Sequence, residues 1–207
     1  MRIDIVSIFP MLVRTVGDFG VARIARERSI LELNFWDPRD YCEDNYRRVD
    51  DRPYGGGPGM VMQAPPLAAA IRDARLAGQG RVIGLSPQGR PLDQGTVERL
   101  AAEPALVLLA GRYEGIDQRL LDAEVDEELS IGDYVVAGGE LPAMVLIEAL
   151  VRFLPGVLGN EESAKTDSFS VGLLDWPHYT RPEKFEGRTV PQTLLGGNHN
   201  EIRRWRL

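Results

Sequence analysis

Two short apolar runs constrain the fold of this chain more than any other feature of its sequence. Arg81–Leu85 (RVIGL) and Leu106–Ala110 (LVLLA) are almost continuously apolar, which is typical of strands covered on both faces of a parallel sheet. Ile3–Phe9 and Leu31–Trp36 are two further strand candidates. These runs alternate with segments of helical spacing, so we predict an α/β fold.

The segments between the runs have the apolar spacing of amphipathic helices. The strongest pattern lies near residue 150, where apolar residues recur three and four positions apart and a proline fits the first turn. The predicted helices are Pro10–Gly17, Val21–Arg28, Pro66–Ala77, Gln94–Ala101 and Pro142–Phe153.

Cysteine and histidine usage excludes several classes of site. Cys42 is the single cysteine, so no internal disulfide can form, as is usual in a reducing cytoplasm. Cys42, His178 and His199 do not have the spacing of zinc ligands, and we expect no structural metal.

No apolar run approaches the roughly 20 residues of a membrane span, and the N-terminus lacks the features of a signal peptide. We therefore predict a cytoplasmic protein.

The charge is unevenly distributed. The net charge of -7 argues at first against a nucleic-acid partner. However, residues 93–140 carry 12 acids and 3 arginines, whereas residues 176–207 carry 6 basic residues and 3 acids. Of the 24 basic residues 22 are arginine, which suits phosphate contact and base stacking. This distribution permits RNA binding, although a solvated charged surface remains the default interpretation.

Clustered glycine and proline residues interrupt the alternation in three places: Asp50–Met60, Gly111–Asp117 and Ile131–Ala143. Each such loop alone is usually only a turn. Together they are candidates for a ligand site, because ligands of α/β sheets bind beyond the carboxyl ends of strands. A fourth irregular segment, Gly156–Asp175, is interpreted as an interdomain linker. Rossmann, Walker A, GxSxG and HExxH motifs are absent from the sequence.

Nine short strings resemble the bacterial tRNA (guanine-N1)-methyltransferase family in order and spacing along essentially the whole chain. They are DDRPYGGGPGM (50–60), LSPQGR (85–90), GRYEGID (111–117), SIGDYV (130–135), GGELPAM (138–144), RFLPGVLG (152–159), DSF (167–169), PHYTRP (177–182) and GNHNEIRRWRL (197–207). The resemblance implies an enzyme that methylates guanine N1 at anticodon-loop position 37 of tRNA, where another guanosine precedes it.

The family belongs to the knotted SPOUT class, and its architecture could not be worked out from periodicity. The resemblance implies a methyltransferase domain over residues 1–155, with a mostly parallel sheet and a deep trefoil knot at about 81–153. It also implies a linker at 156–175 and the start of a small helical tRNA-binding domain at 176–207, truncated relative to the family. Family members are homodimers, and each active site is built from both subunits.

The resemblance further implies S-adenosylmethionine as the methyl donor, bound in a bent shape by the loops of the knot. Magnesium is associated with the family, and Glu114 could contact either the amino group of the donor or a magnesium ion. The positions that match the donor site are Leu85, Ser86, Pro87, Gln88, Gly111, Tyr113, Glu114, Ile131, Gly132, Tyr134, Val136, Gly138, Gly139 and Pro142.

Two residues match the catalytic positions of the family. Asp167 corresponds to the general base that removes the N1 proton, and Arg152 to the residue that stabilises negative charge on O6. Each has an ordinary alternative: Asp167 is also a good helix N-cap, and Arg152 suits a helix C-terminus. Residues expected to face the RNA are Asp50, Arg52, Gly57, Gly59, His178, Tyr179 and Arg181. Arg203, Arg204 and Arg206 are further candidates for phosphate contact.

Two other functions are compatible with the same sequence. Another SPOUT enzyme would methylate the ribose 2′-hydroxyl, and analysis of the methylated nucleoside separates the two. A non-catalytic RNA-binding protein could keep the fold, but it has no need of Asp167, Arg152 and intact donor loops.

Overall fold

In the computed structural model the chain forms two compact units, Met1–Glu161 and Glu162–Leu207. The residues that the structure describes are 1–159, 167–169 and 172–206. The division falls inside the segment predicted as a linker, 156–175, and somewhat beyond the predicted domain end at residue 155. No helix among the described residues combines the length and the apolar character needed to cross a bilayer.

Five parallel strands form the central sheet of the first unit, in the order β2-β1-β6-β5-β7. Their bounds are β1 Arg2–Val6, β2 Glu32–Trp36, β5 Arg81–Pro91, β6 Ala105–Ala110 and β7 Glu127–Ser130. All six residues of β6, the middle strand, are buried. The predicted α/β class with a parallel sheet is confirmed.

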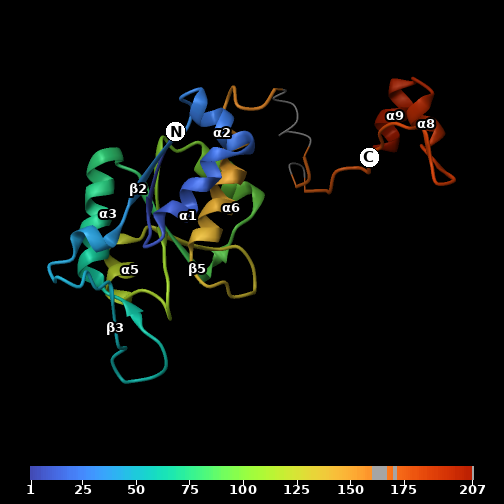
Figure 1. The fold of residues 1–207 in the computed structure, drawn as a ribbon. Coiled ribbons are helices and arrows are strands. Elements are labelled where there is room, and N and C mark those ends of the chain that lie inside the picture. Colours follow the sequence, from blue (N-terminus) through green and yellow to red (C-terminus); the bar gives the residue numbers. More distant parts are fainter. Residues whose placement is uncertain (160–166, 170–171, 207) are drawn as a thin grey trace. The chain divides into compact units, whose positions relative to one another are not determined.

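Helices cover both faces of this sheet (Figure 1). The first unit contains α1 Pro10–Arg14, α2 Gly20–Glu27, α3 Ala64–Gly78, α4 Gln94–Ala101, α5 Gln118–Glu124 and α6 Glu140–Val151, with short 3-10 helices η1 Thr15–Asp18 and η2 Pro38–Tyr41. On one face α1, α2, α4 and α6 enclose a core cluster, and on the other α3 and α5 enclose a second. Successive side chains of a strand point to opposite faces of the sheet, so the same strands contribute residues to both clusters.

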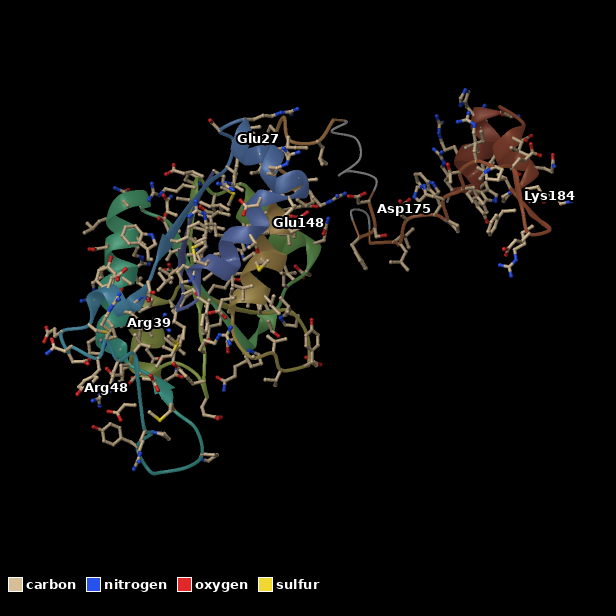
Figure 2. The ribbon with its side chains drawn as sticks, in the orientation of Figure 1. Glu27, Arg39, Arg48, Glu148, Asp175 and Lys184 are labelled. Atoms are coloured by element: carbon tan, nitrogen blue, oxygen red, sulfur yellow. The ribbon has the colours of Figure 1, made fainter. Side chains whose placement is uncertain are left out.

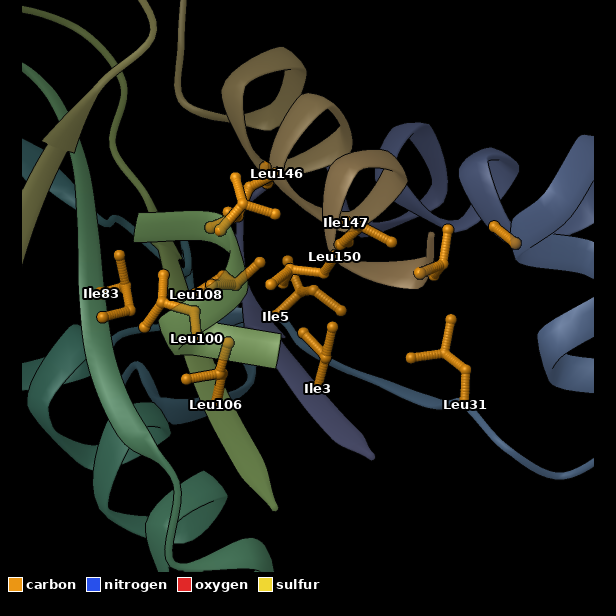
Figure 3. Packing of buried hydrophobic residues seen from close by; sticks show 14 of the residues in the cluster. Ile3, Ile5, Leu31, Ile83, Leu100, Leu106, Leu108, Leu146, Ile147 and Leu150 are labelled. Atoms are coloured by element: carbon orange, nitrogen blue, oxygen red, sulfur yellow. The ribbon is translucent and has the colours of Figure 1, made fainter. Parts of the chain in front are cut away.

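The core under α6 shows this packing at close range (Figure 3). Ile5 and Leu108 of the sheet lie beneath Leu146, Ile147 and Leu150 of the helix, and none of these five side chains has any exposed area. Burial of a side chain of this size contributes about 1.5–3 kcal/mol. The helix is therefore anchored firmly, and its N-terminus lies directly after the loop that ends at Gly139.

The predicted boundaries are wrong in some places. The first strand ends at Val6 rather than Phe9, because Pro10 starts α1, and the helix predicted to Gly17 changes to a 3-10 helix after Arg14. The strand predicted to end at Leu85 continues to Pro91, with an irregular register against β7 between Leu85 and Arg90.

The sequence analysis missed α5 and β7 altogether. Both are short and polar, and β7 begins with Glu127, whose carboxylate pairs with Arg90 and Arg99 at the sheet edge. It also missed a two-stranded ribbon, β3 Asp50–Asp51 with β4 Val61–Met62, which supports the glycine loop between them. That loop projects away from the sheet in Figure 1.

The second unit has little regular structure among its described residues. It contains a hairpin of β8 Lys184–Phe185 and β9 Arg188–Thr189, followed by α8 Gln192–Leu195 and α9 His199–Trp205. Asn198 caps α9 by accepting hydrogen bonds from the backbone of the first turn. Asp175 and Lys184 of this unit are labelled in Figure 2.

Candidate functional site

A cavity of about 320 Å³ lies beside the carboxyl ends of β6 and β7 in the first unit, next to the middle of β5. Its walls are residues 84–88 of β5, the loops that follow β6 and β7, and the first turn of α6. This volume lies in the range of small-ligand sites, which favour this edge of a parallel sheet.

All fourteen residues predicted to hold the methyl donor line this one cavity: Leu85, Ser86, Pro87, Gln88, Gly111, Tyr113, Glu114, Ile131, Gly132, Tyr134, Val136, Gly138, Gly139 and Pro142. They come from three segments that are far apart in the sequence, and the parallel sheet brings them together. The cavity has apolar walls, such as Leu129, as well as the carboxylates of Glu114 and Glu128. It can therefore enclose a flat apolar ring and also receive a cationic group.

The loop after β7 is closed by its own hydrogen bonds. The Ser130 hydroxyl accepts from the backbone N–H of Gly132 at 3.2 Å, and the Tyr134 N–H donates to the Gly132 carbonyl at 2.9 Å. Gly132 has a φ of +144°, a conformation that L side chains rarely adopt. This local closure gives one wall of the cavity a defined shape.

Gly139 brings the end of the same loop against the end of β6. Its N–H donates to the Gly111 carbonyl at 2.8 Å. A Cβ at Gly139 would lie 2.7 Å from the Ala110 Cα and 2.9 Å from the Gly111 nitrogen, which are backbone atoms. The close approach of these two loops therefore requires glycine at this position.

The β3–β4 ribbon is fastened to the loop after β6. Met62 donates its N–H to the Gly115 carbonyl at 2.9 Å, and Glu114 donates its N–H to the Met60 carbonyl at 3.0 Å. The glycine loop predicted to face RNA, including Gly57 and Gly59, thus emerges beside the cavity. Both glycines have positive φ, and Arg52 in the same loop is exposed.

Aromatic and charged side chains gather where this ribbon meets the cavity. Tyr113 is half exposed, and its pKa is raised by burial and by the nearby carboxylate of Asp50. The guanidinium groups of Arg112 and Arg39 lie 4.6 and 5.7 Å from the centre of the Phe9 ring. Arg39 is labelled in Figure 2.

The predicted catalytic residues fall in different units. Arg152 is the C-cap of α6, a position at which its charge also suits the helix dipole. Asp167 belongs to the second unit, and Ser168 and Phe169, which follow it, lie in a turn.

The RNA-facing candidates of the second unit lie near its aromatic residues. His178 contacts the Asp175 carboxylate at 2.8 Å, and this interaction lowers the pKa of Asp175. The Tyr179 ring lies 6.1 Å from that of Trp205. Both candidates, like Arg181, are exposed.

Two site residues were missed by the sequence analysis although their motifs were recognised. Arg112 lines the cavity, and Glu140 is a fully buried carboxylate directly behind it. The sequence gives no signal for the burial of Glu140, because an acidic residue at a helix start is normally exposed. No group of three potential metal-ligating side chains occurs among the described residues.

Comparison with known proteins gives a consistent result along the whole chain. The family model described as tRNA (Guanine-1)-methyltransferase TrmD matches residues 1–207. A tRNA (guanine-N(1)-)-methyltransferase of Stutzerimonas stutzeri is 57% identical over 209 residues, which cover 100% of this chain and 84% of the relative. Relatives with the same name from Pseudomonas aeruginosa and Salmonella paratyphi A are 58% and 59% identical, cover 99% and 100% of this chain, and are each matched over 82% of their length.

Proposed function

Because the chain belongs to the tRNA (guanine-1)-methyltransferase family, and is thus a methyltransferase, we propose that it transfers a methyl group from S-adenosylmethionine to N1 of guanine in tRNA. We further propose that the target is position 37 of the anticodon loop when a guanosine precedes it. The observation that carries the proposal is the single cavity lined by all fourteen predicted donor residues.

The composition of this cavity fits the donor. Leu85, Leu129 and Pro142 offer apolar contact to an adenine ring, while the Glu114 or Glu128 carboxylate can receive the amino group of the methionine part. When bound, S-adenosylmethionine supplies an activated methyl group on a positively charged sulfur. The described residues by themselves form no magnesium site, because no group of three potential metal ligands occurs among them.

The protein must position guanine N1 and remove its proton, since the neutral base is a weak nucleophile. We assign proton removal to the carboxylate of Asp167. Negative charge then develops on O6, and the guanidinium of Arg152 stabilises it. Asp50, Arg52, Gly57 and Gly59 of the ribbon loop, with His178, Tyr179 and Arg181, hold the anticodon loop.

We also propose that the enzyme is a homodimer, in which the donor cavity of one subunit is completed by Asp167 of the partner subunit. Support comes from an exposed apolar surface of the first unit, here called the α1–α6 surface: Phe9, Met11, Leu12, Leu141 and Val145. The helices α1 and α6 contact each other, so these exposed side chains lie on neighbouring elements. Contiguous exposed apolar surface marks a protein interface.

The family's trefoil knot at 81–153, its tRNA-binding domain from residue 176 and its cytoplasmic location belong to the same proposal. In the sheet β5 lies between β6 and β7, two strands that follow it in sequence, an order that unknotted α/β sheets also have. Residues of these three strands and of the loops after β6 and β7 line the cavity.

The decisive experiment uses labelled S-adenosylmethionine and tRNA with adjacent guanosines at positions 36 and 37. We expect label in 1-methylguanosine, and Asp167→Asn should reduce single-turnover rates by about 10²-fold or more, the usual contribution of general base catalysis. Glu186→Gln, an exposed carboxylate of the β8–β9 hairpin, is the control and should retain the rate. Label in a 2′-O-methylribose would indicate the other SPOUT activity, and no label transfer would indicate an RNA-binding protein.

A further inference from the structure

We infer that Glu140 is a positioning residue that, through Arg112 and Ser7, sets the shape of the donor cavity. The inference rests on the proposed function, since it assumes that this cavity binds S-adenosylmethionine. Glu140 itself does not line the cavity, whereas Arg112 does.

Both carboxylate oxygens of Glu140 are used. Oε1 accepts a hydrogen bond from the Ser7 hydroxyl at 2.8 Å, and Oε2 accepts one from Nε of Arg112 at 2.8 Å. Glu140 has no exposed area, and Ser7 has none either. A fully buried carboxylate with an arginine partner is rare, and replacing such pairs with apolar residues is often neutral or stabilising. Stability alone is thus a weak explanation for this pair.

The pair connects the end of β1 with two segments that line the cavity, the loop after β6 and the loop before α6. Ser7 follows β1, and its hydroxyl oxygen also accepts a hydrogen bond from the backbone N–H of Phe9 at 2.9 Å. Arg112 follows β6 and uses a second nitrogen to bind the Ala137 carbonyl at 3.2 Å. Ala137 belongs to the loop between β7 and α6, and its neighbour Gly138 forms a backbone bridge with Arg112.

The adjacent glycine leaves room for the pair. A Cβ at Gly138 would collide with the Arg112 side chain and would lie 2.5 Å from Oε2 of Glu140. The carboxylate therefore holds Arg112, and Arg112 holds the 137–139 backbone where it forms the cavity wall. Loss of the Glu140 charge should make the backbone of this wall less rigid, without removing a direct contact between the protein and the donor.

Glu140→Gln tests this role, because it removes the negative charge that holds the Arg112 guanidinium and leaves one acceptor oxygen where two donors now bind. We expect the Kd for S-adenosylmethionine, measured by titration calorimetry without tRNA, to rise by about tenfold or more, as when a supporting shell is lost. The KM for the donor should rise in parallel, whereas the KM for tRNA should change little. A merely structural residue would not produce this split.

Glu124→Gln is the matched control. Glu124 is also buried and pairs with Arg72 at 2.7 Å, but neither Glu124 nor Arg72 lines the cavity. It should lower the melting temperature as much as Glu140→Gln without changing the donor Kd. If Glu140→Gln does not fold, Arg112→Lys provides the test, since lysine keeps the charge but cannot bind Glu140 and Ala137 together.

Each outcome decides a different point. A raised donor Kd in Glu140→Gln or Arg112→Lys, with the Glu124→Gln control unchanged, supports the inference. Unchanged donor binding in the folded variants overturns it while leaving the proposed function intact. Absence of S-adenosylmethionine binding by the wild-type protein overturns the donor site and the inference together.

Discussion

At Gly139 the backbones of two loops approach so closely that a single methyl group has no space. Gly139→Ala would place a Cβ 2.7 Å from the Ala110 Cα, and only a shift of the backbone can relieve this contact. We expect a loss of about 1–3 kcal/mol of unfolding free energy, the usual cost of overpacking, and a large loss of donor affinity. Thermal melts and calorimetry with S-adenosylmethionine measure the two effects.

Gly95→Ala is the control for this substitution. Gly95 lies in α4, and an added Cβ would meet only an Asp93 oxygen at 3.8 Å. Alanine is favoured over glycine in helices, so this variant should gain about 0.5–1 kcal/mol and bind the donor normally. Equal behaviour of the two variants would contradict the claim that the contact at Gly139 shapes the site.

A second residue-level prediction concerns the Asp175–His178 pair. The hydrogen bond with the His178 ring is the main cause of the lowered pKa of Asp175, and burial opposes it. A backbone hydrogen bond from Trp176 and the charges of His178 and Arg206 lower the pKa further. Because the folded pKa lies below the unfolded value of about 3.9, the stabilisation is present above that value and is lost as pH falls through the folded pKa. In NMR titrations, His178→Ala should raise the pKa of Asp175 toward its ordinary value, whereas His199→Ala should not.

Among the secondary-structure elements, α6 combines a buried side with an exposed side. Leu146 has no exposed area and packs on the sheet, whereas Val145 is 48% exposed on the α1–α6 surface. Leu146→Ala should therefore cost about 2–5 kcal/mol of unfolding free energy, and Val145→Ala much less in a monomer. Denaturant melts at low protein concentration compare them. A similar cost for both would mean that the two sides of α6 are not distinguished by burial.

The same helix illustrates what the sequence could predict. Its apolar spacing located it to within two residues, and the apolar runs of β5 and β6 predicted buried parallel strands, because both patterns report burial directly. In contrast, β7 was missed because its two glutamates give this short segment a polar character that is typical of a loop. In the folded protein, arginine pairing stabilises it as an edge strand. The fourteen cavity residues were identified only through a family resemblance, since the glycine-rich loops indicated a ligand site but not which residues would line it.

For the whole molecule, the α1–α6 surface predicts self-association. Val145→Asp places a charge in the middle of this surface, and burying an unpaired charge at an interface is strongly unfavourable. We expect the wild-type protein to be a dimer and this variant to be a monomer in sedimentation equilibrium. Leu76→Asp is the control, because Leu76 is 82% exposed on α3, which covers the other face of the sheet. A dimeric Val145→Asp variant would exclude this surface as the interface.

A dimer with shared active sites makes a quantitative prediction that independent sites do not. Asp167→Asn removes the proposed base and Gly139→Ala damages the donor cavity, so each homodimer should be inactive. In a mixed dimer, the intact cavity belongs to the Asp167→Asn chain and the intact aspartate to the Gly139→Ala chain. If the cavity of one subunit uses Asp167 of the partner subunit, these two halves meet in one working site. Random exchange makes half of the dimers mixed, and each has one good site of two, so activity should recover to about a quarter of wild type. Sites formed within one chain would each keep a defect, and mixing would then restore nothing.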